Sequence, residues 1–466
     1  NSPYYEIQTV SGKQTIGSLS NNDIIQVAYD VDSGYIWYGK NNSWYLSGDP
    51  SSGTPMSPAA QSSNNDGSIR LYLNGRTGSG ANIMHVNFGS RPFNYTPPTG
   101  FKALSAKNIR PYNLNAAPVI RPKKHFDTLF YTGNGSTSQN ISGLEFAPDF
   151  VWIKSRSSGS GHHSLLNSVS GDKAMNTTRT NGEYSVSAFN FNTNSIDVPY
   201  YGNDYSMNTN SATYVAWCWK AGGAAVTNTV GNISAQVSAN DEAGFSIITY
   251  TGDGNSSGNV GTGLRSTQPL DWAIVKRTDS TSDWQVAHSA SGQSNNFAYH
   301  LNLNSTDQLS GSSPYHMGTQ NATNGDRLYL AEGGLTSSAT YVAYVWQERP
   351  GYSKFGSYTG NGSSSNPTYV DLGFRPAFVM VKCINASEHW NIPVDTYSYN
   401  GVDKSVSANL TSAERDMDGG DAMDFLSNGF KIRNTDNNYA NDGKTFIYMA
   451  FAEQPGFTNF DTFPNA

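Results

Sequence analysis

The sequence predicts an all-β protein made of tandem β-sandwich or jelly-roll modules, and two observations carry this prediction. One glycine-containing motif occurs three times, and each copy is followed by the same succession of strand-like segments. The stretches between those segments are rich in Asn, Ser, Thr and Gly and have no helical period, apart from a single turn expected near Ala413–Met417. Short strands separated by such clusters are typical of β-sandwiches.

The repeated motif is Tyr-Thr-Gly-Asn-Gly at Tyr131–Gly135 and Tyr358–Gly362, and Tyr-Thr-Gly-Asp-Gly at Tyr250–Gly254. The copies start 119 and 108 residues apart (250−131 and 358−250), a spacing typical of one domain. Glycine adopts positive φ freely, and Asn or Asp tolerates it, so the motif predicts a tight turn after a strand. Its recurrence therefore marks three homologous modules rather than three binding sites.

Two further segments recur in each module and predict buried strands. The first contains a proline, then a nearly continuous apolar run expected of a strand buried on both faces, and closes on lysine: Phe146–Lys154, Pro269–Lys276 and Phe374–Lys382. The second is rich in aromatic residues: Thr213–Lys220, Thr340–Trp346 and Thr445–Phe451. Weaker similarities predict two more strands, one starting at Ser164, Trp284 and Trp390 and the other at Phe191, Leu301 and Asn409.

The first 115 residues lack these segments, so the chain divides into modules at 1–115, 116–226, 227–350 and 351–466. In the first module an alternating pattern predicts a hairpin around the turn Asp32-Ser-Gly34, with Ile25, Val27 and Tyr29 on one strand and Ile36 and Tyr38 on the other. Tryptophans are expected in the cores of the first three modules: Trp37, Trp44, Trp152, Trp217, Trp219, Trp272 and Trp346.

Composition limits the class of protein. The chain has 466 residues, only 14% of them charged, and a net charge of −7, so it lacks the clustered basic face of a nucleic-acid-binding protein. The two cysteines, Cys218 and Cys383, lie in different modules and are expected to be buried free thiols. No apolar stretch approaches the length of a membrane span, so we expect neither membrane insertion nor a signal peptide. Because the chain starts at Asn1 without Met, we expect it to be part of a longer protein.

The first module resembles the SPRY domain. The resemblance rests on Asn22-Asp-Ile24, Gly34-Tyr-Ile-Trp37, Asn42-Ser-Trp44 and the closing segment Val86–Phe93. It implies a bent, two-sheet β-sandwich of the interaction or lectin-like type. The strands that open a SPRY domain are short or absent here, so we expect the domain to be reduced or incomplete at its N-terminus.

The three repeats resemble a domain of unknown function that is common in predicted virion proteins of marine phages, especially cyanophages. The motifs that carry the resemblance are clearest in the first repeat, and the third has drifted to Ile447-Tyr-Met-Ala-Phe451. The resemblance implies an external virion appendage, such as a tail fibre, which associates with other virion proteins and forms a homotrimer. Three alternatives stay open: a structural head fibre, capsid decoration or baseplate protein; a polysaccharide-degrading tailspike; and a cellular adhesin.

Catalytic and metal-binding patterns are weak, so we expect neither enzymatic activity nor a cofactor. A glycosidase needs two carboxylates that flank the scissile bond, whereas Glu145, Glu183 and Glu242 are isolated among turn residues. His162 and His163 are adjacent, which in a strand places them on opposite faces, and a surface loop is expected. An acidic cluster has the oxygen ligands that Ca²⁺ prefers, but a solvated turn is favoured: Asp416, Asp418, Asp421 and Asp424.

Aromatic residues in the loops where the repeats differ are the candidate binding residues. They are Tyr200, Tyr201 and Tyr205 in the first repeat, Tyr315 and His316 in the second, and Tyr397 and Tyr399 in the third. Tyrosines among Asn, Gly and Asp combine stiff contact area with adaptable hydrogen bonding. We expect them to stack on sugars of a host-surface glycan or receptor; the alternative is that they pack the loops or a subunit interface.

Overall fold

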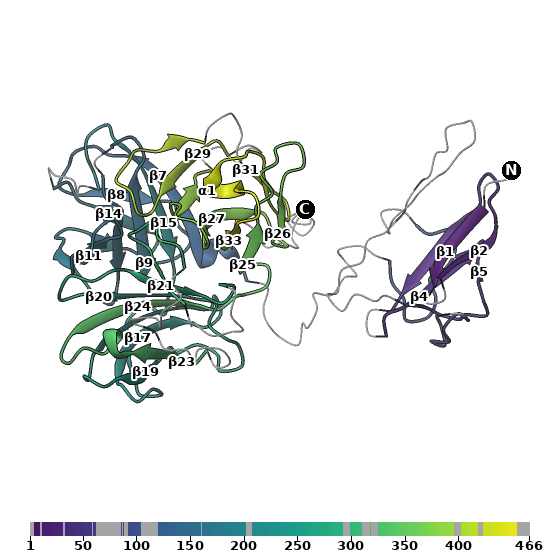
Figure 1. The fold of residues 1–466 in the computed structure, drawn as a ribbon, viewed down its shortest axis with the longest axis horizontal. Coiled ribbons are helices and arrows are strands. Elements are labelled where there is room, and N and C mark those ends of the chain that lie inside the picture. The colour runs from purple at the N-terminus through teal and green to yellow at the C-terminus, as the bar shows by residue number, and fades with distance from the viewer. Residues whose placement is uncertain are drawn as a thin grey trace. The chain divides into compact units, whose positions relative to one another are not determined.

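The computed structural model divides the chain into two compact units, Asn1–Ala116 and Ala117–Ala466. It describes residues 4–9, 12–30, 33–57, 59–61, 85, 87, 92–103, 120–159, 161–201, 207–291, 299–309, 317, 325–395, 402–417 and 423–453. The regular secondary structure described in both units is almost wholly strand, which confirms the predicted all-β class (Figure 1). Among the described residues, the exceptions are two 3₁₀ turns, η1 (Pro122–Lys124) and η2 (Glu332–Gly334), and one short helix, α1 (Asn437–Ala440).

The described part of the N-terminal unit contains two small antiparallel sheets. One pairs β1 (Tyr4–Thr9) with β2 (Gly12–Ser18), and the other holds β3 (Ile25–Tyr29), β4 (Tyr35–Lys40), β5 (Ser43–Trp44) and β6 (Ala60–Gln61). The predicted hairpin is confirmed, because β3 pairs with β4 and Gly34 turns the chain at a φ of +72°.

Trp37 is the centre of the N-terminal unit. Its ring is buried and contacts Phe101 edge to face at 5.7 Å, and its indole N–H donates to the carbonyl of Thr54 at 2.7 Å. Trp44 packs against the same core, whereas Val27 is 49% exposed, so the buried face of the hairpin carries Ala28 and Trp37. Most of the segment expected to close a SPRY domain, 86–93, lies outside the described residues, and that resemblance stays a prediction.

Each repeat of the C-terminal unit, which we call the repeat body, forms one large and one small sheet. The large sheet of the first repeat has the order β12 (Tyr184–Ser185), β11 (Lys173–Asn176), β10 (Ser164–Asn167), β9 (Phe150–Ser155), β15 (Thr213–Trp219), β7 (Phe126–Thr132). Its small sheet has the order β13 (Asn190–Phe191), β14 (Ser195–Val198), β8 (Gln139–Ser142).

The second repeat has the same plan with two added strands. Its large sheet has the order β16 (Val226–Asn228), β17 (Ala235–Asn240), β18 (Phe245–Thr251), β24 (Thr340–Trp346), β20 (Trp272–Arg277), β21 (Gln285–His288), β22 (Leu301–Asn302). The small sheet pairs β19 (Ser257–Gly261) with β23 (Arg327–Ala331). Strands β16 and β17 have no counterpart in the sheets of the other two repeats, as far as their residues are described.

The third repeat again pairs a large sheet with a small one. The large sheet has the order β25 (Ser353–Thr359), β33 (Thr445–Ala452), β27 (Pro376–Cys383), β28 (Asn391–Pro393), β29 (Lys404–Ser407), β30 (Arg415–Asp416). The small sheet has the order β26 (Tyr369–Asp371), β32 (Gly429–Ile432), β31 (Met423–Leu426).

The recurring segments occupy equivalent places in the three large sheets. Strands β15, β24 and β33 are central and are flanked on one side by β9, β20 and β27, which confirms the two predicted strands. All three flanking strands are almost fully buried along their length, as the continuous apolar runs predicted. Proline lies at or before the start of each, where its missing N–H costs no ladder hydrogen bond.

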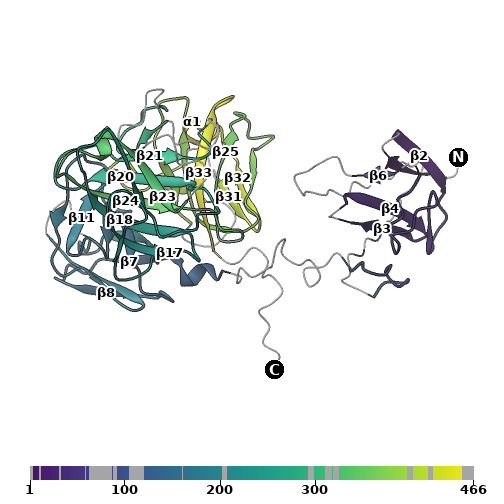
Figure 2. The ribbon, with the colours of Figure 1, turned by 90° about the horizontal axis from the view of Figure 1, so that it is seen from below.

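Both faces of each large sheet lie in a hydrophobic core. One face packs on the small sheet of the same repeat, and this gives each repeat a core of its own. The other faces of all three sheets meet in a single shared core, whose aromatic rings include Phe126, Trp219, Trp346, Phe378 and Phe451. The three sheets therefore surround one axis, as the views in Figures 1 and 2 show, and the repeats form a three-sided body.

A cyclic set of hydrogen bonds links each repeat to the one before it. At equivalent positions just before β10, β21 and β28, a ring N–H donates to a backbone carbonyl of the neighbouring repeat. Trp284 donates to Asn176, Trp390 donates to Asn302, and His163 closes the circle by donating to Ser407, at 2.9 to 3.0 Å. The acceptors occupy one equivalent position too, because Asn176, Asn302 and Ser407 pair with the first residues of β10, β21 and β28.

The lysine that ends each proline-containing segment follows the same cyclic pattern. Lys154 donates to Thr411, Lys276 to Thr180 and Lys382 to Thr306, each time to a carbonyl of the preceding repeat. All three side chains are completely buried, and burial lowers the pKa of each ammonium group to about 8. The ion pair between Arg156 and Glu414 adds a further link between the first and third repeats.

The Tyr-Thr-Gly-Asn/Asp-Gly motif is confirmed as a turn that follows a strand of the large sheet. Its tyrosine stacks on an aromatic residue of the central strand at about 5 Å in every repeat: Tyr131 on Tyr214, Tyr250 on Tyr341 and Tyr358 on Phe446. The last glycine has φ between +58° and +81°. The first glycine lies so close to a backbone carbonyl that a Cβ could not fit: Gly133 on Thr209, Gly252 on Thr336 and Gly360 on Asn441.

Three local predictions were wrong. Residues 413–417 contain β30 rather than a helical turn, and α1 lies later, capped by Asp436. Phe191 belongs to the small sheet and Asn409 lies in the turn after β29, so the counterparts of Leu301 are in β11 and β29. His163 is fully buried rather than in a surface loop, because its Nδ1 accepts from the indole of Trp152 while its Nε2–H bonds the third repeat.

The first glycine of the motif offers a direct test of the packing. In Gly252→Ala the new Cβ would overlap the carbonyl oxygen of Thr336, so we expect a loss of stability of about 2–3 kcal/mol. Urea unfolding measures this as a lower midpoint at unchanged slope. The control is Gly159→Ala, where a Cβ meets nothing within 4 Å. Equal midpoints for the two variants would contradict the described packing.

The buried lysines predict an unusual pH dependence of stability. The unfolded lysine keeps its proton up to its ordinary pKa of 10.5, whereas folded Lys154 loses it near 8 because of burial. Between these values unfolding takes up a proton, so folding stability rises with pH. The measured quantity is the difference in the free energy of unfolding between the wild type and Lys154→Met. We expect this difference to increase at pH values above 8, by up to about 1.4 kcal/mol per pH unit. The difference should be flat near pH 7, and a flat profile up to pH 10 would contradict the prediction.

Candidate functional site

The outer faces of the three small sheets are the best candidate for a functional surface. The inner face of each small sheet packs into the core of its own repeat, so the other face points away from the body. The register identifies equivalent positions, because β8 pairs with β14, β19 with β23 and β26 with β32 in the same way. At the inner positions all six residues are apolar: Ile141, Ile196, Val260, Leu328, Val370 and Phe430.

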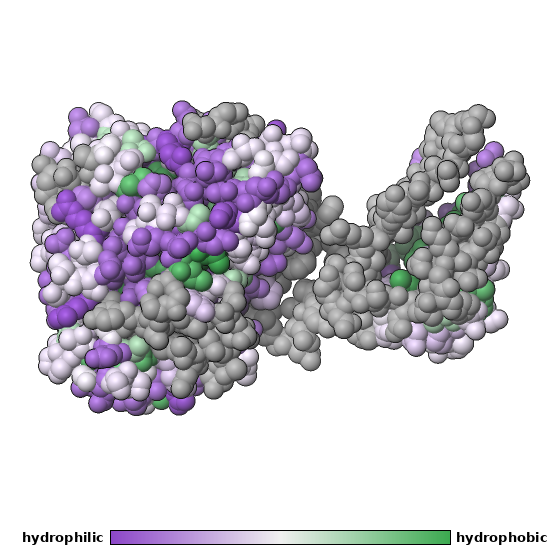
Figure 3. All heavy atoms as spheres, viewed as in Figure 1, coloured by the Kyte–Doolittle hydropathy of each residue, from purple (hydrophilic) through white to green (hydrophobic). Residues whose placement is uncertain are grey.

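The outer positions differ between the repeats. Asn140 faces Asp197 in the first repeat, Asn259 faces Tyr329 in the second, and Tyr369 faces Lys431 in the third. Core packing therefore keeps these paired inner positions apolar, while the outer positions carry different chemistry in every copy. Figure 3 shows that the visible face of the repeat body is mostly hydrophilic, with small hydrophobic patches between.

In the first repeat the outer face carries a ladder of amides around one carboxylate. Asp197 accepts hydrogen bonds from Asn140 at 2.8 Å and from Asn190 at 3.1 Å, one on each neighbouring strand. Asn140 also donates to the hydroxyl of Ser195 at 2.9 Å. Partial burial alone would raise the pKa of the Asp197 carboxyl, but the hydrogen bonds from these asparagines and Asn192 lower it below its ordinary value. The ladder is thus a fixed array of one charged acceptor and several amides.

In the second repeat the outer face is partly covered by its own chain. The segment before β17 lies against β19, where Asn232 and Asn259 exchange hydrogen bonds, and Arg327 donates to the carbonyl of Val230. In the third repeat Tyr369 is 44% exposed, and its hydroxyl lies 3.3 Å from the carbonyl of Asn428. The pKa of the Tyr369 hydroxyl is raised, mainly by burial and to a smaller extent by the nearby Asp371 carboxylate.

Two of the seven candidate binding residues lie within the described residues. Tyr200 is 41% exposed and follows β14, the strand that carries Asp197. Tyr201 packs against the first-repeat core, and its hydroxyl donates to the carbonyl of Ser187, so it supports the loop. The other five lie outside the described residues: Tyr205, Tyr315, His316, Tyr397 and Tyr399.

Sequence reasoning missed the outer sheet faces. The candidates were sought in loops, whereas Asn140, Asp197 and Tyr369 lie on strands that are short and polar on alternate residues. A signal was present, since each of these segments carries alternating apolar residues, as in Asn140-Ile141 and Tyr369-Val370. Without the pairing register, however, the equivalent positions could not be aligned across repeats whose loops differ in length.

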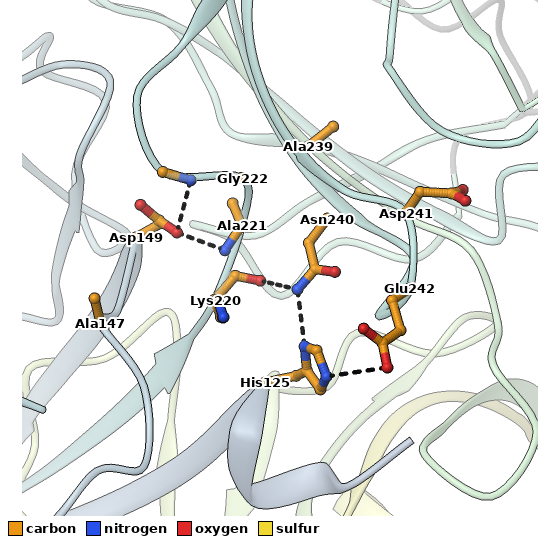
Figure 4. A pocket seen from close by; sticks show the side chains of 11 residues that line it. His125, Ala147, Asp149, Lys220, Ala221, Gly222, Ala239, Asn240, Asp241 and Glu242 are labelled. Carbon is orange, nitrogen blue, oxygen red and sulfur yellow. Dashed lines mark hydrogen bonds and ion pairs between the residues drawn. The ribbon is translucent and has the colours of Figure 1, made fainter. Parts of the chain in front are cut away.

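A polar pocket of about 390 Å³ lies at the junction of the first and second repeats (Figure 4). His125 lies between Asn240, at 2.9 Å, and the carboxylate of Glu242, at 3.8 Å, while burial lowers the pKa of the imidazole. Asp149 accepts from the backbone N–H groups of Ala221 and Gly223.

The carboxylate of Asp149 has a structural role. Its counterpart in the second repeat, Asp271, accepts from the backbone N–H of Glu348 and from the hydroxyl of Ser289, as Asp149 accepts from the hydroxyl of Ser168. Both carboxylates therefore hold the chain segment that leads into the next repeat, and this pocket is a by-product of the junction.

Within the described part of the chain, no group of three or more His, Cys, Asp or Glu side chains could hold a metal ion. In the acidic cluster, Asp416 pairs with Lys404 and Asp424 pairs with Arg433, while Asp418 and Asp421 lie outside the described residues. Cys218 and Cys383 are buried free thiols, as predicted. None of the described helices is long and apolar enough to span a membrane.

Comparison with known proteins gives a family but no activity. No curated protein matches the chain. One family model, described as "Domain of unknown function (DUF7483)", matches residues 121–455. The match begins beside η1 and ends just after β33, so a single family domain corresponds to the whole repeat body with its three sandwiches. This chain therefore belongs to the DUF7483 family.

Proposed function

We propose that this chain is part of an external appendage of a phage virion, a tail fibre or another receptor-binding protein, and that it contacts host-surface polysaccharide. The observation that carries the proposal is the divergence of the three outer sheet faces on a body whose inner positions stay apolar. A purely architectural repeat has no need of three different outward surfaces.

The chemistry of the first-repeat face suits a saccharide. Vicinal sugar hydroxyls are both donors and acceptors, and the ladder of Asn140, Asp197 and Asn190 presents amides beside a carboxylate. Tyr200 supplies an exposed aromatic ring beyond the end of β14. Tyrosine rings combined with polar groups give contact area at low entropic cost. This face and the loop aromatics together form the proposed binding surface.

The alternative is a purely structural appendage, such as a head fibre, a capsid decoration or a baseplate protein. The cyclic bonding of the repeat body supports it, because the buried polar groups Lys154, Lys276, Lys382 and His163 all serve to lock the repeats together. The two proposals differ in one respect: only the first requires the outer faces to bind anything.

Binding to host envelope polysaccharide tests the proposal. We expect the full chain to bind cells or purified envelope glycans of its host, and Asp197→Ala and Tyr200→Ala each to weaken binding about tenfold, since an aromatic stack or a charged hydrogen bond contributes about 1–3 kcal/mol. Asn255→Ala is the control, because Asn255 is exposed near the motif turn of the second repeat. The absence of binding to all host glycans, with no block of adsorption, would favour the structural alternative.

Product analysis and light scattering test two linked expectations. Envelope polysaccharide incubated with the protein should stay intact, and release of oligosaccharides would instead support a tailspike enzyme. We also propose that the appendage is a homotrimer of this chain. Light scattering under native conditions should then give three chains per particle, and a monomer would count against that assembly.

A further inference from the structure

The edge of the large sheet is closed in the second repeat and open in the first. In the second repeat β17 pairs with β18 from Phe245 to Tyr250. Strand β7 is the first-repeat counterpart of β18, because Tyr131 and Tyr250 hold the same position opposite Tyr214 and Tyr341. Within the described residues β7 pairs only with β15, so the place that β17 fills in the second repeat is vacant beside β7.

Equivalent residues of the two strands are buried to different extents, as expected if only β18 has a neighbour on this edge. Ser246 and Ile247 of β18 are buried, whereas the equivalent Asp127 and Thr128 of β7 are only half-buried. Phe130, in the place of Thr249, is 41% exposed, and the guanidinium of Arg156 lies 5.4 Å from its ring centre. An exposed phenylalanine on an edge strand is a feature that isolated proteins usually avoid.

The backbone of β7 has a donor directed to this open edge. The N–H of Thr128 bonds to the carboxylate of the preceding Asp127 at 2.9 Å rather than to a strand. An extended partner would accept this N–H in place of the side chain. Burial raises the pKa of the Asp127 carboxyl, so a cation placed opposite would also relieve the cost of its charge.

A groove of about 170 Å³ follows the open edge. Phe126, Asp127, Thr128 and Phe130 line it from β7, and the third repeat completes it with Ala377, Arg375, Asp395 and Glu453 among others. Arg375 is paired with both Asp395 and Glu453, which leaves the groove acidic in balance despite Lys123 at one end.

We propose that the open edge of β7 is a docking site for an extended strand of another protein, which adds to the large sheet as β17 does in the second repeat; that this protein belongs to the virion rests on the proposed function. Antiparallel pairing fixes the chemistry of that strand. In the second repeat Gln236 lies opposite Thr249 and Ala239 lies opposite Ser246, the counterparts of Phe130 and Asp127. The partner strand carries an apolar residue opposite Phe130 and, three residues later in its own sequence, a basic residue opposite Asp127.

The equivalent edge in the third repeat is closed to such a partner. On that side strand β25 has an isolated bridge from Ser353 to Arg349, and the N–H of Phe355 donates to Glu348. It has Lys354 in the place of Asp127 and Ser357 in the place of Phe130. Lysine on an edge strand disfavours strand addition, and a basic partner residue would face a like charge. The same sheet edge therefore differs among the three repeats. It is open in the first repeat, paired with β17 of the same chain in the second, and protected by a lysine in the third.

A peptide based on β17 tests the proposal. The probe has the sequence of residues 233–241 with Gln236→Leu and Ala239→Lys, and binding to the full chain is measured by fluorescence anisotropy. We expect saturable binding, at least about fivefold weaker for Phe130→Lys and unchanged for Ser357→Lys, the matched position on β25. A peptide with Glu at the lysine position should bind at least about threefold more weakly. Phe130→Lys should melt like the wild type, because this side chain is partly exposed.

Amide hydrogen exchange gives the second readout. The bound peptide should slow exchange in residues 126–132 and leave 353–359 unchanged. Equal affinity for the wild type and Phe130→Lys, protection of β25 instead of β7, or no saturable binding at millimolar peptide would each overturn the proposal. Self-association that Phe130→Lys abolishes would overturn the stated partner too, since it would assign the edge to a second copy of this chain. These outcomes do not depend on glycan binding, so each proposal can fail separately.

Discussion

The structure of the repeat body depends on one constraint: the large sheet of each repeat is apolar on both faces, and the repeat supplies only one small sheet to cover it. The second face must be buried elsewhere, and three such sheets arranged around an axis bury it against one another. Bulky rings such as Trp219, Trp346 and Phe451 fill the centre. A single repeat taken from this body would expose that aromatic face to water, so the three sandwiches are parts of one folding unit.

The buried polar groups follow from the same constraint. Polar side chains at the rim of the shared core reach backbone carbonyls of the adjacent repeat, which also accept from an N–H of their own turn. Trp284, Trp390 and His163 use one position for this purpose, although two are indoles and one is an imidazole. The geometry of the position is retained while the residue type changes, because each ring places an N–H at a similar distance from its own backbone.

Much of this fold could be predicted from the sequence, for physical reasons that also explain the errors. Strands such as Phe150–Ser155 and Thr213–Trp219 were recognisable because their burial on both faces requires continuous apolar runs. The shared core was not recognisable, since a run buried against a neighbouring repeat has the same pattern as one buried within its own. His163 was misplaced for that reason: its acceptor, Ser407, lies far along the chain. The outer faces were missed because Asn140 and Asp197 become neighbours only through the register of β8 and β14.

The closing hydrogen bond from His163 to Ser407 has a consequence for how such proteins can change in evolution. In open arrays such as solenoids, a repeat can be gained or lost because each contacts only its neighbours. Here the first repeat is also the neighbour of the third, so the closed arrangement accommodates three copies and no other number. A gene duplication that adds a fourth repeat, or a deletion that leaves two, would leave an aromatic face without a counterpart. New specificity in this architecture must therefore come from substitution on the outer faces and edges, and not from copy number.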